Sequence, residues 1–293
     1  MKKKNPDNGV FVDLTYDAGF KTVFADKANK ELLRHLLNNV LPKEAHINNI
    51  LEYLDREQPR DTVDSHRSHL DLLCESDDGR RFIVECQKAN ETAFFQRCVY
   101  YASGVYHTRL KAGEKYSVLR PVYSIAFLNY RIKHNDDSRW DADNILSEWI
   151  FTEKRTGEVA PSTISIIFAE LDRFTKTEAQ CKSELDWLFY IFRHSVSLTE
   201  IPAEIKGRQF FKDLLEACRI AAFDEKKKLQ YESSMMDERD IIAQREYALE
   251  EGIRETNERN ARNLLKAGID PKTIAECLEM PIEDVLALKN SCS

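Results

Sequence analysis

The fold is decided by residues 69–87, which read HLDLLCESDDGRRFIVECQ. Aliphatic runs at 69–75 and 80–87 are typical of β-strands, and the polar residues 76–79 between them are typical of a turn. We therefore predict an antiparallel hairpin. Because successive side chains of a strand point to opposite faces, the register of the turn decides which side chains meet.

Two turn lengths are compatible with this hairpin. A three-residue loop over 77–79, in which Gly79 supplies the positive φ of a bulge, sets Asp71 opposite Glu85. A two-residue loop would instead pair Asp71 with Cys86 and leave the two carboxylates on opposite faces. A functional interpretation of the two carboxylates therefore depends on the longer loop.

In the longer-loop register, Asp71 and Glu85 form a pair of carboxylates that repel each other unless a proton or a cation compensates them. Mg²⁺ accepts oxygen ligands and bridges to phosphate oxygens, so this pair and the backbone carbonyl of Cys86 form a candidate metal site for phosphodiester hydrolysis. Mn²⁺ is the alternative ion. Gln87 shares a face with Glu85 in either register and is expected to orient a water or a phosphate oxygen, although it cannot supply positive charge.

The composition restricts the class of protein. The chain has 293 residues, of which 42% are hydrophobic and 32% charged, and its net charge is −7. An acidic chain does not coat nucleic acid by bulk electrostatics, so any DNA site must be local. The seven cysteines form no Cys-x-x-Cys pair, and no apolar run is long enough to cross a bilayer. We expect a cytoplasmic protein with reduced thiols and no membrane partner.

Apolar spacing around the hairpin predicts an α/β layer. We expect a helix over residues 18–40 and, with Asn90 as its N-cap, another over 91–110. Strands are expected from the apolar runs at 47–55, 122–128 and 164–168, the last two covered on both faces.

The carboxy-terminal part is predicted to be helical. Amphipathic helices over 178–198 and 207–223 should pack on the sheet domain. Residues 224–262 are densely charged, which favours an exposed long helix over a coiled coil and leaves pairing with another chain open. Residues 261–289 have the spacing of a helix-turn-helix, but acidic residues open its second helix, which favours docking or assembly over DNA reading. The predicted domains are 1–223, a linker at 224–262 and a tail at 263–293, and the carboxy-terminal helices are candidates for homo-oligomer contacts.

Several segments together resemble a known family. Asp71 followed by Glu85-x-Gln87 is similar to the Asp…Glu-x-Lys signature of PD-(D/E)xK nucleases, with glutamine in place of lysine. The sequence resembles the bacterial recombination-promoting nuclease family, also described as PD-(D/E)xK transposase-like, and the resemblance is strong over about residues 11–135. The segments that carry this resemblance are YDAGFKTVF at 16–24, ECQKA at 85–89, FQR at 95–97, YYAS at 100–103 and KAGEKY at 111–116.

The resemblance implies a fold and an activity. The expected fold is a restriction-endonuclease-like core, in which helices flank a mixed central sheet, with a helical carboxy-terminal extension. Asp17 would complete the metal site of Asp71 and Glu85, and Gln87 would stand where the wider superfamily has lysine. The implied activity is that of a magnesium-dependent DNA endonuclease linked to recombination, mobile elements or defence.

Neighbouring residues allow simpler interpretations as well. Asp17 can act as an N-cap, a role compatible with metal binding. Lys21 lies one turn later and either holds a phosphate or stays in solvent, and Arg97 is a candidate contact to a nucleic-acid backbone. His66 and His69 have metal-like spacing without a further ligand nearby, so we expect them to be structural or exposed.

Two alternative functions remain open at this stage. One is a catalytically weak or inactive relative that survives as a DNA-binding or assembly protein. The other is a transposase that performs strand transfer with the same metal chemistry, which only the reaction products distinguish.

Overall fold

The structure is a computed structural model that describes residues 10–54, 70–88, 90–91, 93–161 and 163–291. The chain divides into two compact units, Met1–Met235 and Met236–Ser293, which are described separately. The boundary between them lies inside a long helix, and the three-part division expected from the sequence remains a prediction.

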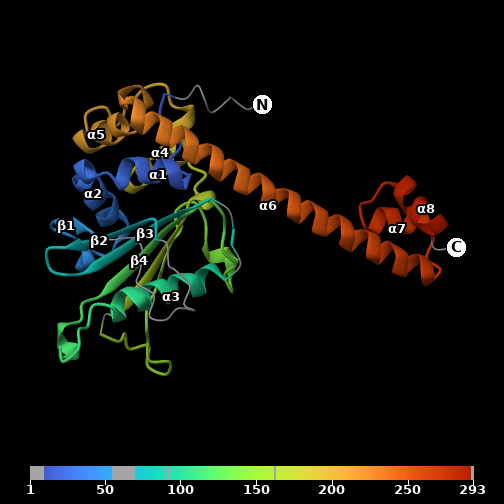
Figure 1. Ribbon diagram of the computed structural model, residues 1–293, viewed down its shortest axis with the longest axis horizontal. Coiled ribbons are helices and arrows are strands. Elements are labelled where there is room, and N and C mark those ends of the chain that lie inside the picture. The colour runs from blue at the N-terminus through green and yellow to red at the C-terminus, as the bar shows by residue number, and fades with distance from the viewer. Residues whose placement is uncertain (1–9, 55–69, 89, 92, 162, 292–293) are drawn as a thin grey trace. The chain divides into compact units, whose positions relative to one another are not determined.

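The first unit is built on a six-stranded mixed sheet with the strand order β1-β2-β3-β4-β6-β5 (Figure 1). The pairs β3–β4 and β4–β6 are parallel, and the other three pairs are antiparallel. This arrangement confirms the predicted mixed sheet flanked by helices. The strands are β1 (Ile50–Tyr53), β2 (Leu72–Ser76), β3 (Arg81–Gln87), β4 (Val122–Leu128), β5 (Leu146–Trp149) and β6 (Ile164–Glu170).

The β2–β3 hairpin has the longer of the two predicted loops. The Ser76 backbone N–H donates to the Arg80 carbonyl at 2.9 Å, and Gly79 has a φ of 80°. The ladder continues through the pair Leu72 and Val84. One further step along this register sets Asp71 opposite Glu85, so the register on which the metal-site hypothesis depends is confirmed.

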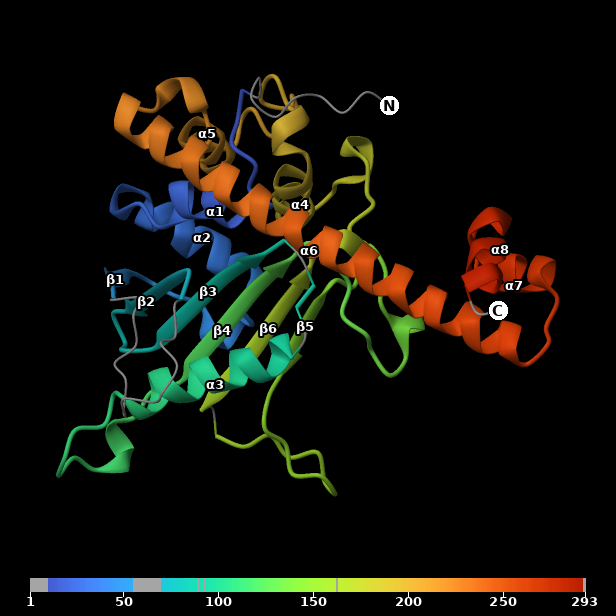
Figure 2. The same ribbon diagram turned by 45° about the vertical axis from the view of Figure 1, so that its right-hand side comes forward.

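Helices cover both faces of the sheet. The α1, α2, α4 and α5 helices lie on one face and α3 on the other (Figures 1 and 2). Separate hydrophobic clusters fill the two sides, as the period of two along each strand requires. The helices of this unit are α1 (Asp17–Phe24), α2 (Lys30–Val40), α3 (Phe94–His107), α4 (Glu184–His194), α5 (Gln209–Ala217) and the first part of α6 (Glu225–Lys266).

The expectation of one continuous helix over residues 18–40 is wrong. Between α1 and α2, the Asp26 carboxylate accepts from the Ala28 backbone N–H at 3.0 Å, and the Asn29 side chain donates to the Val23 carbonyl at 2.8 Å. These short polar side chains offer the backbone an alternative to the helical hydrogen bonds, and the helix therefore breaks there.

Other predicted boundaries need correction. The third helix begins at Phe94 after Ala93, rather than at the expected cap Asn90. The helix expected from residue 178 begins only at Glu184, where Ser183 and Asp186 form a capping box. Strand β5 has no counterpart among the strands expected from the sequence.

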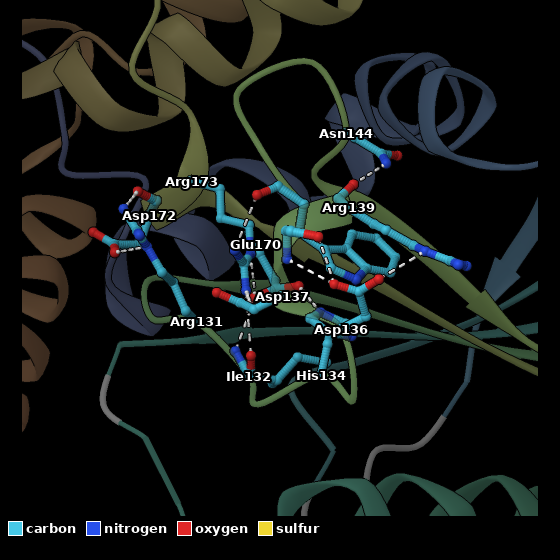
Figure 3. A network of polar contacts seen from close by, with 12 residues as sticks. Arg131, Ile132, His134, Asp136, Asp137, Arg139, Asn144, Glu170, Asp172 and Arg173 are labelled. Carbon is cyan, nitrogen blue, oxygen red and sulfur yellow. Dashed lines mark hydrogen bonds and ion pairs between the residues drawn. The ribbon is translucent and has the colours of Figure 1, made fainter.

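A buried ionic cluster fixes the segment that follows β4 (Figure 3). The Glu170 carboxylate lies at the end of β6 with an exposure of 0%. It accepts hydrogen bonds from the Ile132 backbone N–H at 2.8 Å, from the His134 ring at 2.6 Å and from Arg173 at 2.9 Å. Arg173 also donates to the Asp137 carboxylate at 2.5 Å. Every member is paired, which is the condition under which a buried charged network is tolerated.

The second unit contains the end of α6 together with α7 (Pro271–Cys277) and α8 (Ile282–Ser291). Ala261, Ile274 and Val285 form its small core. Asp270 caps α7 through bonds to two backbone N–H groups, and Gly268 adopts a φ of 83°. No helix in the described part of the chain is both long and apolar enough to cross a bilayer.

Candidate functional site

The hairpin presents its predicted site residues on the side of the sheet that α3 covers. Leu73 and Ile83 pack in the hydrophobic cluster that contains α3 residues. Because side chains repeat every two residues, Asp71, Glu85 and Gln87 share this face. Arg97 reaches the same place from α3, as its contacts described below show.

Glu85 is a deeply buried carboxylate, with an exposure of 4%. Its Oε2 accepts a bond from the Arg97 guanidinium at 3.1 Å, whereas its Oε1 is buried and has no hydrogen-bond partner among the described residues. Burial and then repulsion by Asp71 raise the pKa of Glu85 to about 8, although Arg97 and Lys21 oppose the rise. The environment therefore disfavours the charged form of Glu85 unless more positive charge arrives.

Arg97 connects three polar side chains. Besides Glu85, it donates to the Gln87 side-chain carbonyl at 3.1 Å and forms an ion pair with Glu91. Its guanidinium lies over the Phe94 ring, 4.7 Å from the centroid. Burial lowers the pKa of Arg97, but the carboxylates of Glu85 and Glu91 outweigh burial, and the net shift is upward.

Lys21 joins α1 to the hairpin. Its ammonium group lies 2.5 Å from the Asp17 carboxylate and 3.0 Å from the Asp71 carboxylate. Burial alone would lower the pKa of Lys21, but Asp71 and then Asp17 raise it above its usual value. Of the two alternatives for Lys21, phosphate contact or solvent, the structure matches neither directly, because the side chain pairs with two predicted metal ligands.

The position of α1 depends on a close backbone approach. A Cβ added at Gly19 would lie 1.9 Å from the Asp13 carbonyl oxygen, so only glycine permits this packing. Asp17 is the first helical residue and Tyr16 is the N-cap, which corrects the expectation that Asp17 caps the helix. Asp17 and Lys21 are thus held on one face of α1 at a spacing of one turn.

The main chain and the side chain of Cys86 make different contacts. Its backbone N–H donates to the Asp71 carboxylate at 3.2 Å, and its thiol donates to the Leu14 carbonyl in the cluster under α1. The Arg80 carbonyl, an even number of residues earlier, faces β2. The Cys86 carbonyl therefore faces the same edge, toward Asp71, because the N–H and C=O of one strand residue point to one side.

The predicted residues are brought together as ion pairs. Within the described ranges, no three His, Cys, Asp or Glu side chains converge closely enough to hold a metal ion. Lys21 lies between Asp17 and Asp71, and Arg97 lies against Glu85, so cations of the protein itself stand at the predicted ligands. His66 and His69 lie outside the described residues.

Two neighbours were not expected from the sequence. Glu91, which lies before α3, forms an ion pair with Arg97 in its first turns. The two residues are six positions apart, which is not a spacing at which helix side chains meet. Lys88 follows Gln87, donates to the Thr15 hydroxyl at 2.8 Å and lies over the Tyr16 ring. Only the tertiary packing of the chain before α1 against the end of β3 creates the contacts of Lys88.

Comparison with known proteins connects this arrangement to a family. A family model described as PD-(D/E)XK nuclease family transposase matches residues 14–248. Searches of the curated proteins and of the solved structures give no match. The family match covers the whole sheet, the hairpin with its facing carboxylates and the helices that carry Asp17 and Arg97. The chain therefore belongs to the PD-(D/E)XK nuclease family of transposases.

Proposed function

We propose that the protein is a metal-dependent DNA endonuclease that hydrolyses phosphodiester bonds. The observation that carries the proposal is the pair of facing carboxylates, Asp71 and Glu85, of which Glu85 is buried with one oxygen lacking a partner among the described residues. A buried carboxylate in this condition is costly unless a cation completes its environment. The link to recombination, mobile elements or defence follows from the family and is part of the proposal.

The donor set suits Mg²⁺, a hard cation that PD-(D/E)XK nucleases generally use. Asp71, Glu85 and the Cys86 carbonyl are the proposed ligands, and Asp17 is the proposed further carboxylate. Bound Mg²⁺ would polarise the phosphate and lower the pKa of the attacking water. The family match supports DNA as the substrate.

The cationic side chains have a second role in this proposal. Lys21 and Arg97 are the cations nearest to the candidate ligands, and each already lies within hydrogen-bonding distance of one of them. When a nucleic-acid backbone enters, they neutralise its phosphate oxygens, and this supplies the positive charge that Gln87 cannot. Gln87 orients the attacking water by hydrogen bonds.

The test is plasmid nicking by purified wild-type protein and by Asp71→Asn, with Mg²⁺, Mn²⁺ or a chelator. Asp77→Asn is the matched control, because it makes the same substitution at an exposed position of the same hairpin. We expect metal-dependent nicking by wild type and Asp77→Asn, and none by Asp71→Asn. Equal cutting by all three proteins, or nicking in chelator, would overturn the assignment.

A second candidate function is favoured by the ion pairs themselves. Lys21 and Arg97 compensate the carboxylates without any metal, as they would in a catalytically weak or inactive DNA-binding or assembly protein. DNA binding by wild type without nicking under any metal condition would support this candidate. Strand transfer is distinguished from hydrolysis by the products, since only strand transfer joins a cut end to a second DNA molecule.

A further inference from the structure

An aromatic pocket lies beside the candidate site. It encloses about 530 Å³ between the start of α3, the segment after β4, and strands β5 and β6. Five aromatic side chains form much of its wall, namely Phe94, Phe95, Tyr130, Trp149 and Phe168. This volume and this mainly apolar wall are typical of a pocket for a small organic ligand.

The aromatic rings of the pocket leave exposed surface for stacking. Phe95 is 38% exposed, and its ring meets Trp149 and Phe168 edge to face, with centroids 5.4 and 5.9 Å away. The Tyr130 hydroxyl in the wall is buried and has no hydrogen-bond partner among the described residues. Burial raises the pKa of Tyr130, so the hydroxyl remains a donor at neutral pH.

Polar groups surround this apolar wall. Asn90, Glu91 and Gln96 supply amide and carboxylate groups, and Lys133 supplies an exposed positive charge. Ala93, also in the wall, has a φ of 62°, which is unfavourable for a residue other than glycine. Strained backbone of this kind clusters at ligand sites.

A chain of ion pairs connects the pocket to the candidate site. Glu91 lines the pocket and pairs with Arg97, and Arg97 binds Glu85. On the far wall, the Ile132 backbone is held by the buried Glu170 carboxylate, which fixes the segment that carries Tyr130. The pocket is therefore a supported cavity one side chain away from the proposed phosphodiester site.

We propose that this pocket binds an unpaired nucleobase of the DNA strand that the candidate site cleaves. The proposal rests on the proposed nuclease function and names its substrate form: a single-stranded or locally unpaired DNA. A nucleotide combines a flat ring, polar ring edges and a phosphate. The aromatic wall matches the flat ring, and the amide and carboxylate groups around it match the polar ring edges. Lys133 matches the phosphate.

The charge of the protein supports this occupant. With a net charge of −7, the chain does not attract duplex backbone by its overall charge. Stacking of a base on aromatic side chains contributes binding free energy that does not depend on net charge. A base pocket thus explains how an acidic protein holds a polyanion locally.

The test measures binding of fluorescent oligonucleotides in chelator, so that no strand is cut. One probe is a thymidine dodecamer, and the other is an abasic strand of the same length and charge. Every position of each probe is equivalent, so binding register does not affect the comparison. The variants are Phe95→Ala and Trp149→Ala, and the matched control is Tyr100→Ala, which truncates an aromatic residue on the same helix that is 56% exposed.

We expect wild type and Tyr100→Ala to bind the thymidine strand about tenfold more tightly than the abasic strand, as one stacked base provides. Phe95→Ala and Trp149→Ala should bind both strands equally and at the abasic level. Equal binding of the two strands by wild type, or full discrimination by both pocket variants, overturns the proposal. Loss of self-association in the pocket variants without any base discrimination would assign the surface to a protein contact instead.

The failure of this proposal and that of the proposed function have different signatures. Metal-dependent nicking with no base discrimination leaves the nuclease and removes the base pocket. Base discrimination that depends on Phe95 without any nicking leaves the pocket on a protein that binds DNA but does not cleave it.

Discussion

Two buried carboxylates near the ends of parallel strands differ in how completely their hydrogen bonds are formed. Glu85, on β3, and Glu170, at the end of β6, are 4% and 0% exposed. Glu170 accepts three hydrogen bonds, from a backbone N–H, a histidine and an arginine. Glu85 accepts one bond from Arg97, keeps one oxygen without a partner among the described residues and faces a second carboxylate.

The difference separates a structural carboxylate from a candidate functional one. A buried charge whose partners are complete stabilises the segment that it connects, and removing it leaves those partners uncompensated. A buried charge whose environment is incomplete costs folding free energy and is compensated when a further cation binds. Four predictions test whether this distinction holds.

The largest expected effect is on catalysis. In Glu85→Gln, the proposed metal ligand is lost, and metal-dependent nicking should fall by roughly 1,000-fold, on the order of 4 kcal/mol of transition-state stabilisation. The free energy of unfolding should not fall, because the amide is neutral like the protonated carboxyl that the raised pKa of Glu85 favours. Nicking assays and urea unfolding on the same preparation measure both. A loss of both stability and nicking in Glu85→Gln would contradict the distinction between Glu85 and Glu170.

The next effect concerns stability at the other carboxylate. Glu170→Gln leaves Arg173 and His134 without their buried anion, so the free energy of unfolding should fall by about 3 kcal/mol. Urea unfolding measures the change, with the exposed Glu158→Gln as a control that should unfold like wild type. An unchanged midpoint in Glu170→Gln would show that the cluster of Figure 3 does not stabilise the fold.

Stabilisation by bound metal should also distinguish the Glu85 site from the Glu170 cluster, and measuring it requires no nicking assay. At about 100 times its dissociation constant, Mg²⁺ should stabilise the wild type by about 2.7 kcal/mol, or about 5–10 °C in Tm. Glu170→Gln should keep this shift, and Asp71→Asn should lose it. Calorimetry with potassium chloride at matched ionic strength controls for salt. A shift of equal size in Asp71→Asn would place the metal elsewhere.

The last expected effect is a pH dependence. The pKa of Glu85 is raised to about 8 by burial and by Asp71, so the folded state binds a proton that the unfolded state has released above pH 4.5. Without metal, stability should therefore fall as the pH rises from about 5 to 8. Urea unfolding in chelator measures this slope. Glu85→Gln should lack it, and an identical slope in both proteins would contradict the assignment.

Local signals restricted the register of the hairpin to two alternatives. Gly79 and the strand period of two left two registers open, of which the longer loop sets Asp71 opposite Glu85, and the structure has that longer loop. Apolar spacing predicts the α/β layer, and the density of charged residues predicts the long exposed helix. Turn chemistry and periodicity act over a few residues, which is why a sequence reveals them.

Contacts that depend on tertiary packing could not be predicted. Lys21 was expected near a phosphate or in solvent, yet it pairs with carboxylates that α1 and the hairpin bring together. Glu170 and Arg173 are three residues apart, but His134 is 36 residues from Glu170, and nothing in this spacing indicates one buried cluster. The aromatic pocket likewise gathers rings from α3, β5 and β6, whose relative placement only the folded sheet determines.

The two-sided position of Cys86 has a consequence for how this protein can diverge in evolution. Its thiol faces the apolar interior beside Leu14, while only its main chain faces Asp71. Main-chain groups are the same in every residue type except proline. Homologues should therefore exchange the middle residue of the Glu-x-Gln motif among small apolar types. Variation at that place would record the local packing and leave the chemistry of the motif unchanged.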